Sequence, residues 1–386
     1  MASKPFLTTV IGSFSRPEWL LKAHAHYSEG MISRDSFNRL IDEAIKLTIK
    51  EEELTGLDVI TDGEQERTSF VGYPGEPGRV PGFVTVPREA LNPRAGDILR
   101  QKKTLLTRIR AVCVDKVEFG DLGVADYLKA SRWTNLPIKV TLPAPYLVMW
   151  EAWHSRYSKE PYPNPEDLAY DYASKVLRPN IEKLHQAGVN YIQLDEPMVG
   201  DLTEADEKPD RYHEALMLFY GQKYRGFKEE LKLGIDLLDQ ATAGMSSDLR
   251  VDVHMDRWPN DDSPHYGEGY ERFLPEMLEP DVAFYNLEYV SPGCGDPKVL
   301  AKDLASEGIG LGIGCVSAMD DSRVESVEEV VDFVKPLVPI LGPEKISLVP
   351  TCGFAPGMGK KFDRNVAFAK LTNMVKAAEV LRTGAI

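Results

Sequence analysis

The sequence predicts an α/β fold, specifically a (β/α)8 TIM barrel with an extended loop or hairpin insertion after its second strand. Short apolar runs rich in Val, Ile and Leu alternate with amphipathic helical segments along most of the 386 residues, which is typical of βαβ units. Eight such runs can be distinguished, and polar or acidic residues close many of them. Barrel enzymes carry their chemistry at that end of the strands. An open, doubly wound sheet is the structural alternative, but the repeat favours a closed barrel, and we expect residues 1–386 to form one domain.

The expected strands are short and regularly spaced. They cover residues 8–13, 58–64, 138–142, 191–195, 250–254, 282–288, 309–314 and 346–351. Two of the expected helices begin at Ser33 and Ser326, each with acidic residues in the first turn. The other expected helices cover 165–187, about 204–243, about 269–279, about 297–306 and 362–381. Prolines and glycines punctuate a long loop after the second strand, where residues 101–119 are expected to add a hairpin.

Composition limits the classes of partner. The net charge is −15, which argues against a surface for nucleic acid or anionic lipid. No apolar run approaches the roughly 18 residues that span a bilayer. The four cysteines are widely spaced in a long chain, which favours free thiols in a reducing cytoplasm over a disulfide framework. We therefore expect a cytoplasmic protein that acts on small molecules, and the oligomeric state stays open.

Three potential metal ligands close three of the expected strands. His254, Glu288 and Cys352 end the fifth, sixth and eighth strands. Nitrogen, carboxylate and sulfur ligands are those that zinc uses, and strand ends of one barrel converge despite their separation in sequence. Taken one at a time, these residues also fit a buried histidine, a structural ion pair and a buried thiol.

Acids and a Gly-Ser pair close other strands. Asp195 and Glu196 leave the fourth strand toward opposite faces, so one can enter the barrel mouth while the other caps a helix. An inward Asp195 could hold an ammonium group or carry a proton. Glu64 at the second strand could likewise enter the barrel mouth or cap a helix. The Gly12-Ser13 pair presents backbone amides and a hydroxyl that are suited to binding an anion.

Trp150 follows the third strand. Its ring could stack on a planar substrate, although burial of apolar area is the commoner use of tryptophan.

Taken together, these segments resemble the catalytic domain of cobalamin-independent methionine synthase, in a short single-barrel form. The resemblance runs along most of the chain. It is carried by Ile-Gly-Ser-Phe at 11–14, Gly-Glu-x-Glu-Arg at 63–67, Ile-Gln-x-Asp-Glu-Pro at 192–197, Arg-Val-x-Ser-x-Glu-Glu at 323–329 and Pro-Thr-Cys-Gly at 350–353.

The resemblance implies an activity and a set of site residues. It implies a methyltransferase that moves a methyl group from a donor, such as a methylated folate, to the thiol of homocysteine, giving methionine. It implies zinc, held by His254, Glu288 and Cys352, with the thiol bound as thiolate. The residues expected to hold the substrate are Ile11 through its backbone, Ser13, Glu64, Asp195 and Trp150.

The chain departs from the family pattern at two functional positions. Asp256 stands where the family has a cysteine ligand, and its carboxylate oxygen could bind the metal instead. Asp320 and Asp321 stand where the family has a histidine thought to protonate the leaving folate. Either acid could take that catalytic role if its pKa were raised.

Three other functions fit parts of the pattern. The first is a related zinc-dependent transferase acting on another thiol. The second, which Asp256 and Asp320 motivate, is a catalytically silent barrel that binds an amino acid. The third is a decarboxylase of the uroporphyrinogen type, which shares the barrel but needs no histidine and cysteine ligands and prefers a basic rim.

Overall fold

The structure is a computed structural model that describes residues 4–87, 91, 109–202, 211–256, 269–291, 294–355 and 362–384. Seven parallel strands form a curled sheet in the order β1-β9-β8-β7-β6-β5-β4. The strands are β1 (Leu7–Thr8), β4 (Val140–Pro143), β5 (Tyr191–Asp195), β6 (Arg250–Met255), β7 (Phe284–Glu288), β8 (Gly310–Val316) and β9 (Ile346–Pro350).

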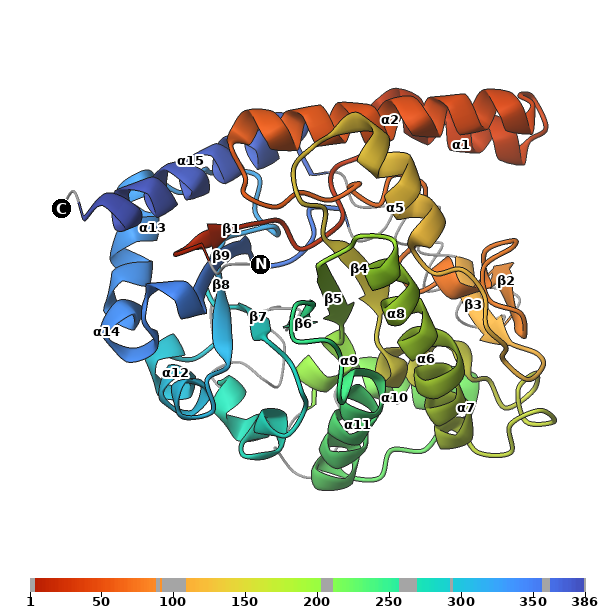
Figure 1. Ribbon diagram of the computed structural model, residues 1–386. Coiled ribbons are helices and arrows are strands. Elements are labelled where there is room, and N and C mark those ends of the chain that lie inside the picture. Colours follow the sequence, from red (N-terminus) through yellow and green to blue (C-terminus); the bar gives the residue numbers. More distant parts are fainter. Residues whose placement is uncertain are drawn as a thin grey trace.

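A short segment closes the sheet into a barrel. Val59 forms a parallel bridge with Thr9, and Ile60 forms one with Ile138, so residues 59–60 join the β1 edge to the β4 edge. The predicted barrel is therefore confirmed, and its second strand is reduced to these two bridges. Figure 1 shows the strands in the centre with the helices around them.

The helices of the outer layer agree with the expected positions in most places. Ser33 is the N-cap of α2 (Arg34–Thr55), and its hydroxyl accepts a hydrogen bond from the Ser36 amide. Ser326 caps α13 (Val327–Val334) in a capping box with Glu329. The remaining helices include α1 (Glu18–Ser28), α5 (Val124–Ala130), α6 (Pro145–Ala152), α7 (Pro165–Asp171), α8 (Arg178–Gln186), α9 (Pro197–Gly200), α12 (Pro297–Ser306), α14 (Val338–Leu341) and α15 (Arg364–Thr383).

Two helical expectations were wrong. The stretch expected as one helix over about 204–243 is divided, in its described part, into α10 (Arg211–Tyr220) and α11 (Phe227–Thr242). Gly221 and Gly226 lie between them with φ values of 72° and 105°, which end a helix rather than continue it. The stretch expected as a helix over 269–279 forms only the short 3-10 turns η5 (Tyr270–Phe273) and η6 (Glu276–Leu278).

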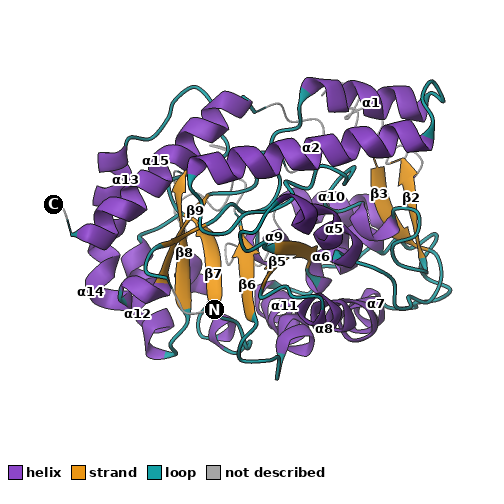
Figure 2. Ribbon diagram, turned by 45° about the horizontal axis from the view of Figure 1, so that its top comes forward, coloured by secondary structure: helices purple, strands orange, loops and turns teal. Residues whose placement is uncertain are grey.

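An antiparallel pair lies outside the barrel after its second strand. β2 (Phe83–Pro87) pairs with β3 (Ile109–Cys113), and Figure 2 shows this pair at one side of the molecule, beyond the barrel strands. The hairpin expected over 101–119 is thus replaced by a pair whose first strand comes earlier in the chain. Its residues 101–108 lie outside the described part. Among the described residues, no helix has the length and apolar character that crossing a bilayer requires.

A buried acid ties α2 to the second barrel strand. The Glu52 carboxylate accepts hydrogen bonds from the Thr61 amide at 2.7 Å and the Thr61 hydroxyl at 3.3 Å. Burial raises the pKa of Glu52 from 4.5 to about 8, although both hydrogen bonds oppose the shift. Glu52 is therefore protonated in the folded protein at pH values where the unfolded chain has already lost that proton.

Replacement of this acid is expected to change the pH dependence of stability. Between pH 4.5 and 8 the folded protein holds one proton more than the unfolded chain, so Glu52 makes stability fall as pH rises. In Glu52→Gln this contribution disappears, and the slope of unfolding free energy against pH should become more positive by up to about 1.4 kcal/mol per pH unit. Urea unfolding of both proteins between pH 5 and 8 measures it, and parallel slopes would contradict the assignment.

Candidate metal centre and amino-acid pocket

A histidine, an aspartate and a cysteine meet at the carboxyl ends of β6 and β9. His254 lies near the end of β6, Asp256 follows that strand directly, and Cys352 lies two residues beyond β9. One ligand atom from each residue lies within 4.8 Å of the other two. The Cys352 thiol donates a hydrogen bond of 3.0 Å to Oδ2 of Asp256. The structure thus brings together three of the residues that the sequence analysis assigned to a metal.

The unused atoms of this cluster fit a cation. Nδ1 of His254 lies 2.9 Å from the carbonyl oxygen of Asn286, and because a carbonyl can only accept, Nδ1 carries the proton. Nε2 of His254 and Oδ1 of Asp256 are buried and have no hydrogen-bond partner. Burial lowers the pKa of His254, which favours the neutral imidazole that metals bind. An imidazole lone pair, a carboxylate oxygen and a sulfur that converge at one place are the donor set of a metal site.

Glu288, the fourth residue assigned to the metal, lies outside this group of three. It ends β7, is buried, and accepts a hydrogen bond from the hydroxyl of Ser291. Its role as a ligand stays a prediction. Ser291 was not among the expected site residues, and its only signal in the sequence is its position three residues after a strand-ending acid.

Buried acidic side chains lie beside the metal ligands. Asp195 is the register partner of His254 on the neighbouring strand, so the two residues stand next to each other at the rim. Glu64 accepts a hydrogen bond of 2.8 Å from the Thr141 hydroxyl and lies 3.3 Å from the Arg67 guanidinium. Burial raises the pKa of Asp195 well above its usual range, and repulsion from Glu64 adds to the shift. A cationic ligand between these acids would relieve both effects.

The backbone around Glu64 is strained and leaves space for its carboxylate. Glu64 has a φ of 53° and Gly63 one of 65°, a left-handed conformation that is unfavourable for a side chain such as glutamate. A Cβ atom on Gly12 would lie 2.6 Å from Oε1 of Glu64. The glycine in the Gly12-Ser13 pair therefore makes room for this carboxylate.

Ser13 lies close to the chain segment that carries the metal ligand Cys352. Its hydroxyl oxygen accepts a hydrogen bond of 3.3 Å from the Ala355 amide, and a Cβ atom on Gly353 would lie 2.2 Å from that oxygen. Gly353 directly follows Cys352, so the close approach places Ser13 beside the metal cluster. The carbonyl of Ile11, the other expected backbone contact, accepts a hydrogen bond from the Gln193 side chain.

Comparison with known proteins identifies the family. The model of the cobalamin-independent synthase catalytic domain matches residues 6–217 and 271–380. The chain belongs to this family. The resemblance drawn from the sequence motifs is therefore confirmed, and so is the prediction of a methyltransferase.

Individual relatives of the family cover nearly the whole chain. A methionine synthase from Sulfurisphaera tokodaii is 29% identical, with 97% of this chain and 92% of the relative aligned. A methionine synthase from Pyrococcus horikoshii is 26% identical with the same coverage. In structure, the chain is similar to a B12-independent methionine synthase from Shewanella sp. W3-18-1 in complex with selenomethionine, with a TM-score of 0.73, 20% identity and 99% of each chain covered.

Glu196 takes the helix-facing alternative of the Asp195-Glu196 pair in this member of the family. Its carboxylate accepts a hydrogen bond of 3.2 Å from the Leu147 amide at the start of α6. Burial raises the pKa of Glu196 to about 8, although hydrogen bonds from backbone amides, including that of Leu147, act to lower it. The residue therefore holds α6 at the rim, while Asp195 accepts a hydrogen bond from Gln193 inside the barrel.

Trp150 lies within packed aromatic side chains. It is fully buried on α6, and its ring meets the edge of His213 with 4.7 Å between centroids. This packing is the commoner use of tryptophan that the sequence left open. A contact with substrate stays a prediction.

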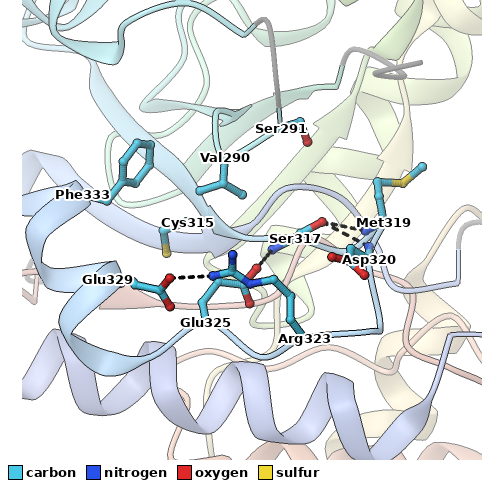
Figure 3. Close-up of a pocket in the computed structure, with 10 residues that line it drawn as sticks. All are labelled: Val290, Ser291, Cys315, Ser317, Met319, Asp320, Arg323, Glu325, Glu329 and Phe333. Carbon is cyan, nitrogen blue, oxygen red and sulfur yellow. Dashed lines mark hydrogen bonds and ion pairs between the residues drawn. The ribbon is translucent and has the colours of Figure 1, made fainter. Parts of the chain in front are cut away.

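Asp320 lies at a cleft of about 410 Å³ between the ends of β7 and β8, which Figure 3 shows, and Asp321 is not among the residues that line it. Ser317, Arg323 and Glu329 also line this cleft. Hydrogen bonds from Ser322 lower the pKa of Asp320, which is opposite to the shift that a proton donor at neutral pH requires. Asp321 is exposed and accepts a hydrogen bond from the Asp363 amide. The direction of this shift gives no support to Asp320 as the general acid, and the catalytic role of Asp320 or Asp321 stays a prediction.

Proposed function

We propose that this protein transfers a methyl group from a methyl donor, with a methylated folate as the first candidate, to the thiol of homocysteine and forms methionine. We propose that one barrel domain carries the whole reaction, with zinc held by His254, Asp256 and Cys352 and with Glu288 as the fourth ligand. The observation that supports it most is the convergence of three donor atoms, two of them without hydrogen-bond partners, directly beside an acidic pocket.

Bound zinc would supply one chemical effect, which is to keep the substrate sulfur anionic and therefore nucleophilic at neutral pH. The protein residues set the conditions for that effect. The Asn286 carbonyl fixes the tautomer of His254 so that Nε2 faces the site. Asp256 and Cys352 would contribute negative charge; both are partly exposed, whereas His254 is buried.

The pocket beside the ligands suits the amino-acid end of homocysteine. Asp195 and Glu64 place two carboxylates where an ammonium group can bind between them. Because the Ser13 oxygen accepts its hydrogen bond from Ala355, its own proton remains available to donate to a substrate carboxylate. The register of β5 with β6 keeps the ammonium end next to the metal end, as a short amino acid requires.

Asp256 gives this site a different character from a site with two cysteines. A carboxylate oxygen is a harder ligand than a thiolate and donates less electron density to zinc. We expect a substrate thiolate on this site to be less nucleophilic than in relatives with a second cysteine, so turnover should be slow while metal binding persists.

The proposal can be tested with two measurements on protein purified without chelator. X-ray absorption at the zinc edge should show one sulfur ligand, and homocysteine should add a second sulfur at about 2.3 Å. Transfer of labelled methyl from 5-methyltetrahydrofolate to homocysteine should then be measured, with 2-mercaptoethanesulfonate as the competing thiol.

Each alternative function has its own outcome in these measurements. Preference for 2-mercaptoethanesulfonate would favour a transferase for another thiol. Homocysteine binding with neither metal nor methyl transfer would favour a silent amino-acid-binding barrel. Absence of a sulfur ligand to zinc would overturn the metal assignment.

A further inference from the structure

A glutamine inside the barrel uses every hydrogen-bonding position of its side chain. Nε2 of Gln193 donates to the Ile11 carbonyl at 2.9 Å and to Oδ1 of Asp195 at 2.6 Å. Its Oε1 accepts from the Lys139 ammonium at 2.6 Å and from Nδ2 of Asn286 at 3.0 Å. The two donors and two acceptor positions are therefore all occupied, and the amide can take only one orientation. This fixed amide holds the Asp195 carboxylate and the Ile11 carbonyl at one place.

The same network reaches the metal ligand through β7. Asn286 donates its side-chain amide to Gln193, and its backbone carbonyl accepts the Nδ1 proton of His254. A Cβ atom on Gly312 would lie 1.8 Å from Oδ1 of Asn286, so the neighbouring strand has no side chain where the Asn286 amide sits. One residue thus contacts both the glutamine that orients Asp195 and the imidazole of the metal site.

Lys139 is a third buried member of the hydrogen-bond network. Its ammonium is buried and also bonds the carbonyl of Val10, on the chain segment that leads to Ile11. Burial lowers the pKa of Lys139 to about 7, while Asp252 and Asp195 oppose that shift. Gln193 lies in β5, Asn286 lies in β7 and Lys139 directly precedes β4, and all three are completely or nearly completely buried. Hydrogen-bonded buried polar networks fix geometry strongly, and among the side-chain polar atoms of these three residues Oδ1 of Asn286 alone has no partner in the described part of the chain.

We propose that Gln193 is a positioning residue that holds Asp195 and the Ile11 carbonyl ready for the substrate ammonium group and, through Asn286, couples occupancy of the amino-acid pocket to the orientation of His254. This inference rests on the proposed function, because it assumes an amino acid in the pocket and a metal on His254. Gln193 itself contacts neither reacting atom. Its effect is expected in binding and in coupling between the two sites, not in the chemistry of transfer.

The test uses norleucine, which has the amino-acid end of methionine but no sulfur that could touch the metal. The protein is loaded with cobalt(II), whose visible spectrum reports the geometry of its ligands. In the wild type, norleucine should bind and shift the cobalt bands. In Gln193→Met, which keeps the length of the side chain, we expect norleucine affinity to fall about 10- to 100-fold and the spectral shift at saturation to vanish.

A second variant separates the two ends of the network. Gln193→Glu keeps acceptors for Lys139 and Asn286 but loses both donors to Asp195 and Ile11. Its cobalt spectrum without norleucine should match the wild type, while norleucine binding should be lost. Tyr285→Phe is the matched control, because this neighbour of Asn286 is equally buried and loses one hydrogen bond, to the Met277 carbonyl, outside the network.

The results distinguish this inference from the proposed function. If Gln193→Met binds norleucine like Tyr285→Phe and keeps the spectral shift, the positioning role is wrong although the pocket and metal site stand. If the wild type itself binds neither norleucine nor cobalt, the proposed function fails and the inference fails with it. If the wild type binds both without a spectral shift, the coupling is overturned.

Discussion

Cys352→Ser is expected to remove the metal from the protein and, with it, methyl transfer. The thiol is the only sulfur in the group formed with His254 and Asp256, and a serine hydroxyl is a poor ligand for zinc. We expect metal content to fall from about one per chain to less than about a tenth after dialysis, because affinity depends on deprotonated ligands in fixed geometry. Turnover should fall about a hundredfold or more, since the substrate thiol then loses both its ionised state and its placement.

The matched control is Cys113→Ser. This thiol is also buried, but it lies in the β2–β3 pair and donates to the Asp115 carbonyl at 3.2 Å, a bond that a hydroxyl can replace. Metal content by plasma mass spectrometry should be unchanged in this control. An equal metal content in Cys352→Ser would show that the ion binds elsewhere.

Arg67→Met is expected to produce the largest loss of stability at the pocket. The Arg67 guanidinium donates to the hydroxyl and the carbonyl of Thr141 at 3.0 and 2.8 Å and lies 4.2 Å from the Tyr73 ring. Burial lowers the pKa of Arg67, but Glu64 and other nearby acids outweigh this and hold the guanidinium charged. Removing it leaves the Glu64 carboxylate buried without its cation, which typically costs about 3–5 kcal/mol.

Chemical denaturation of Arg67→Met beside Arg67→Lys measures this effect. The lysine keeps the charge but cannot form the two parallel hydrogen bonds to Thr141, so its loss should be smaller. Norleucine affinity should fall in both variants, because Glu64 depends on Arg67 for its position. Equal unfolding midpoints for wild type and Arg67→Met would contradict the proposed ion pair.

Part of the site could be predicted from the sequence because functional residues of a barrel lie at the carboxyl ends of its strands. His254 and Cys352 are far apart in the chain, yet both lie near the ends of apolar runs, and parallel strands bring such ends together. Helix starts with local chemistry were equally readable, as the caps at Ser33 and Ser326 show. Helix caps depend on a few neighbouring residues, so they can be recognised from the sequence alone.

Features that depend on sheet register could not be read in the same way. Gln193 stands in a recognisable motif, but three of its four partners come from other segments of the chain. Asn286 looks like an ordinary polar residue of a strand until its neighbour Gly312 is seen to leave space for it. The division between α10 and α11 was missed because apolar periodicity continues across the glycines that interrupt the backbone.

The two single-residue bridges at Val59 and Ile60 indicate where the barrel opens locally. The seam that they close carries few main-chain hydrogen bonds, whereas β8 and β9 share an extended ladder. Local opening of the sheet begins where the fewest main-chain hydrogen bonds must break. Amide protons at residues 59–60 and 138–139 should therefore exchange with deuterated solvent before those of β8 and β9. Ser13 and Glu64 follow the two segments joined by the Thr9–Val59 bridge, and the binding pocket is therefore built along the most easily opened side of the cylinder.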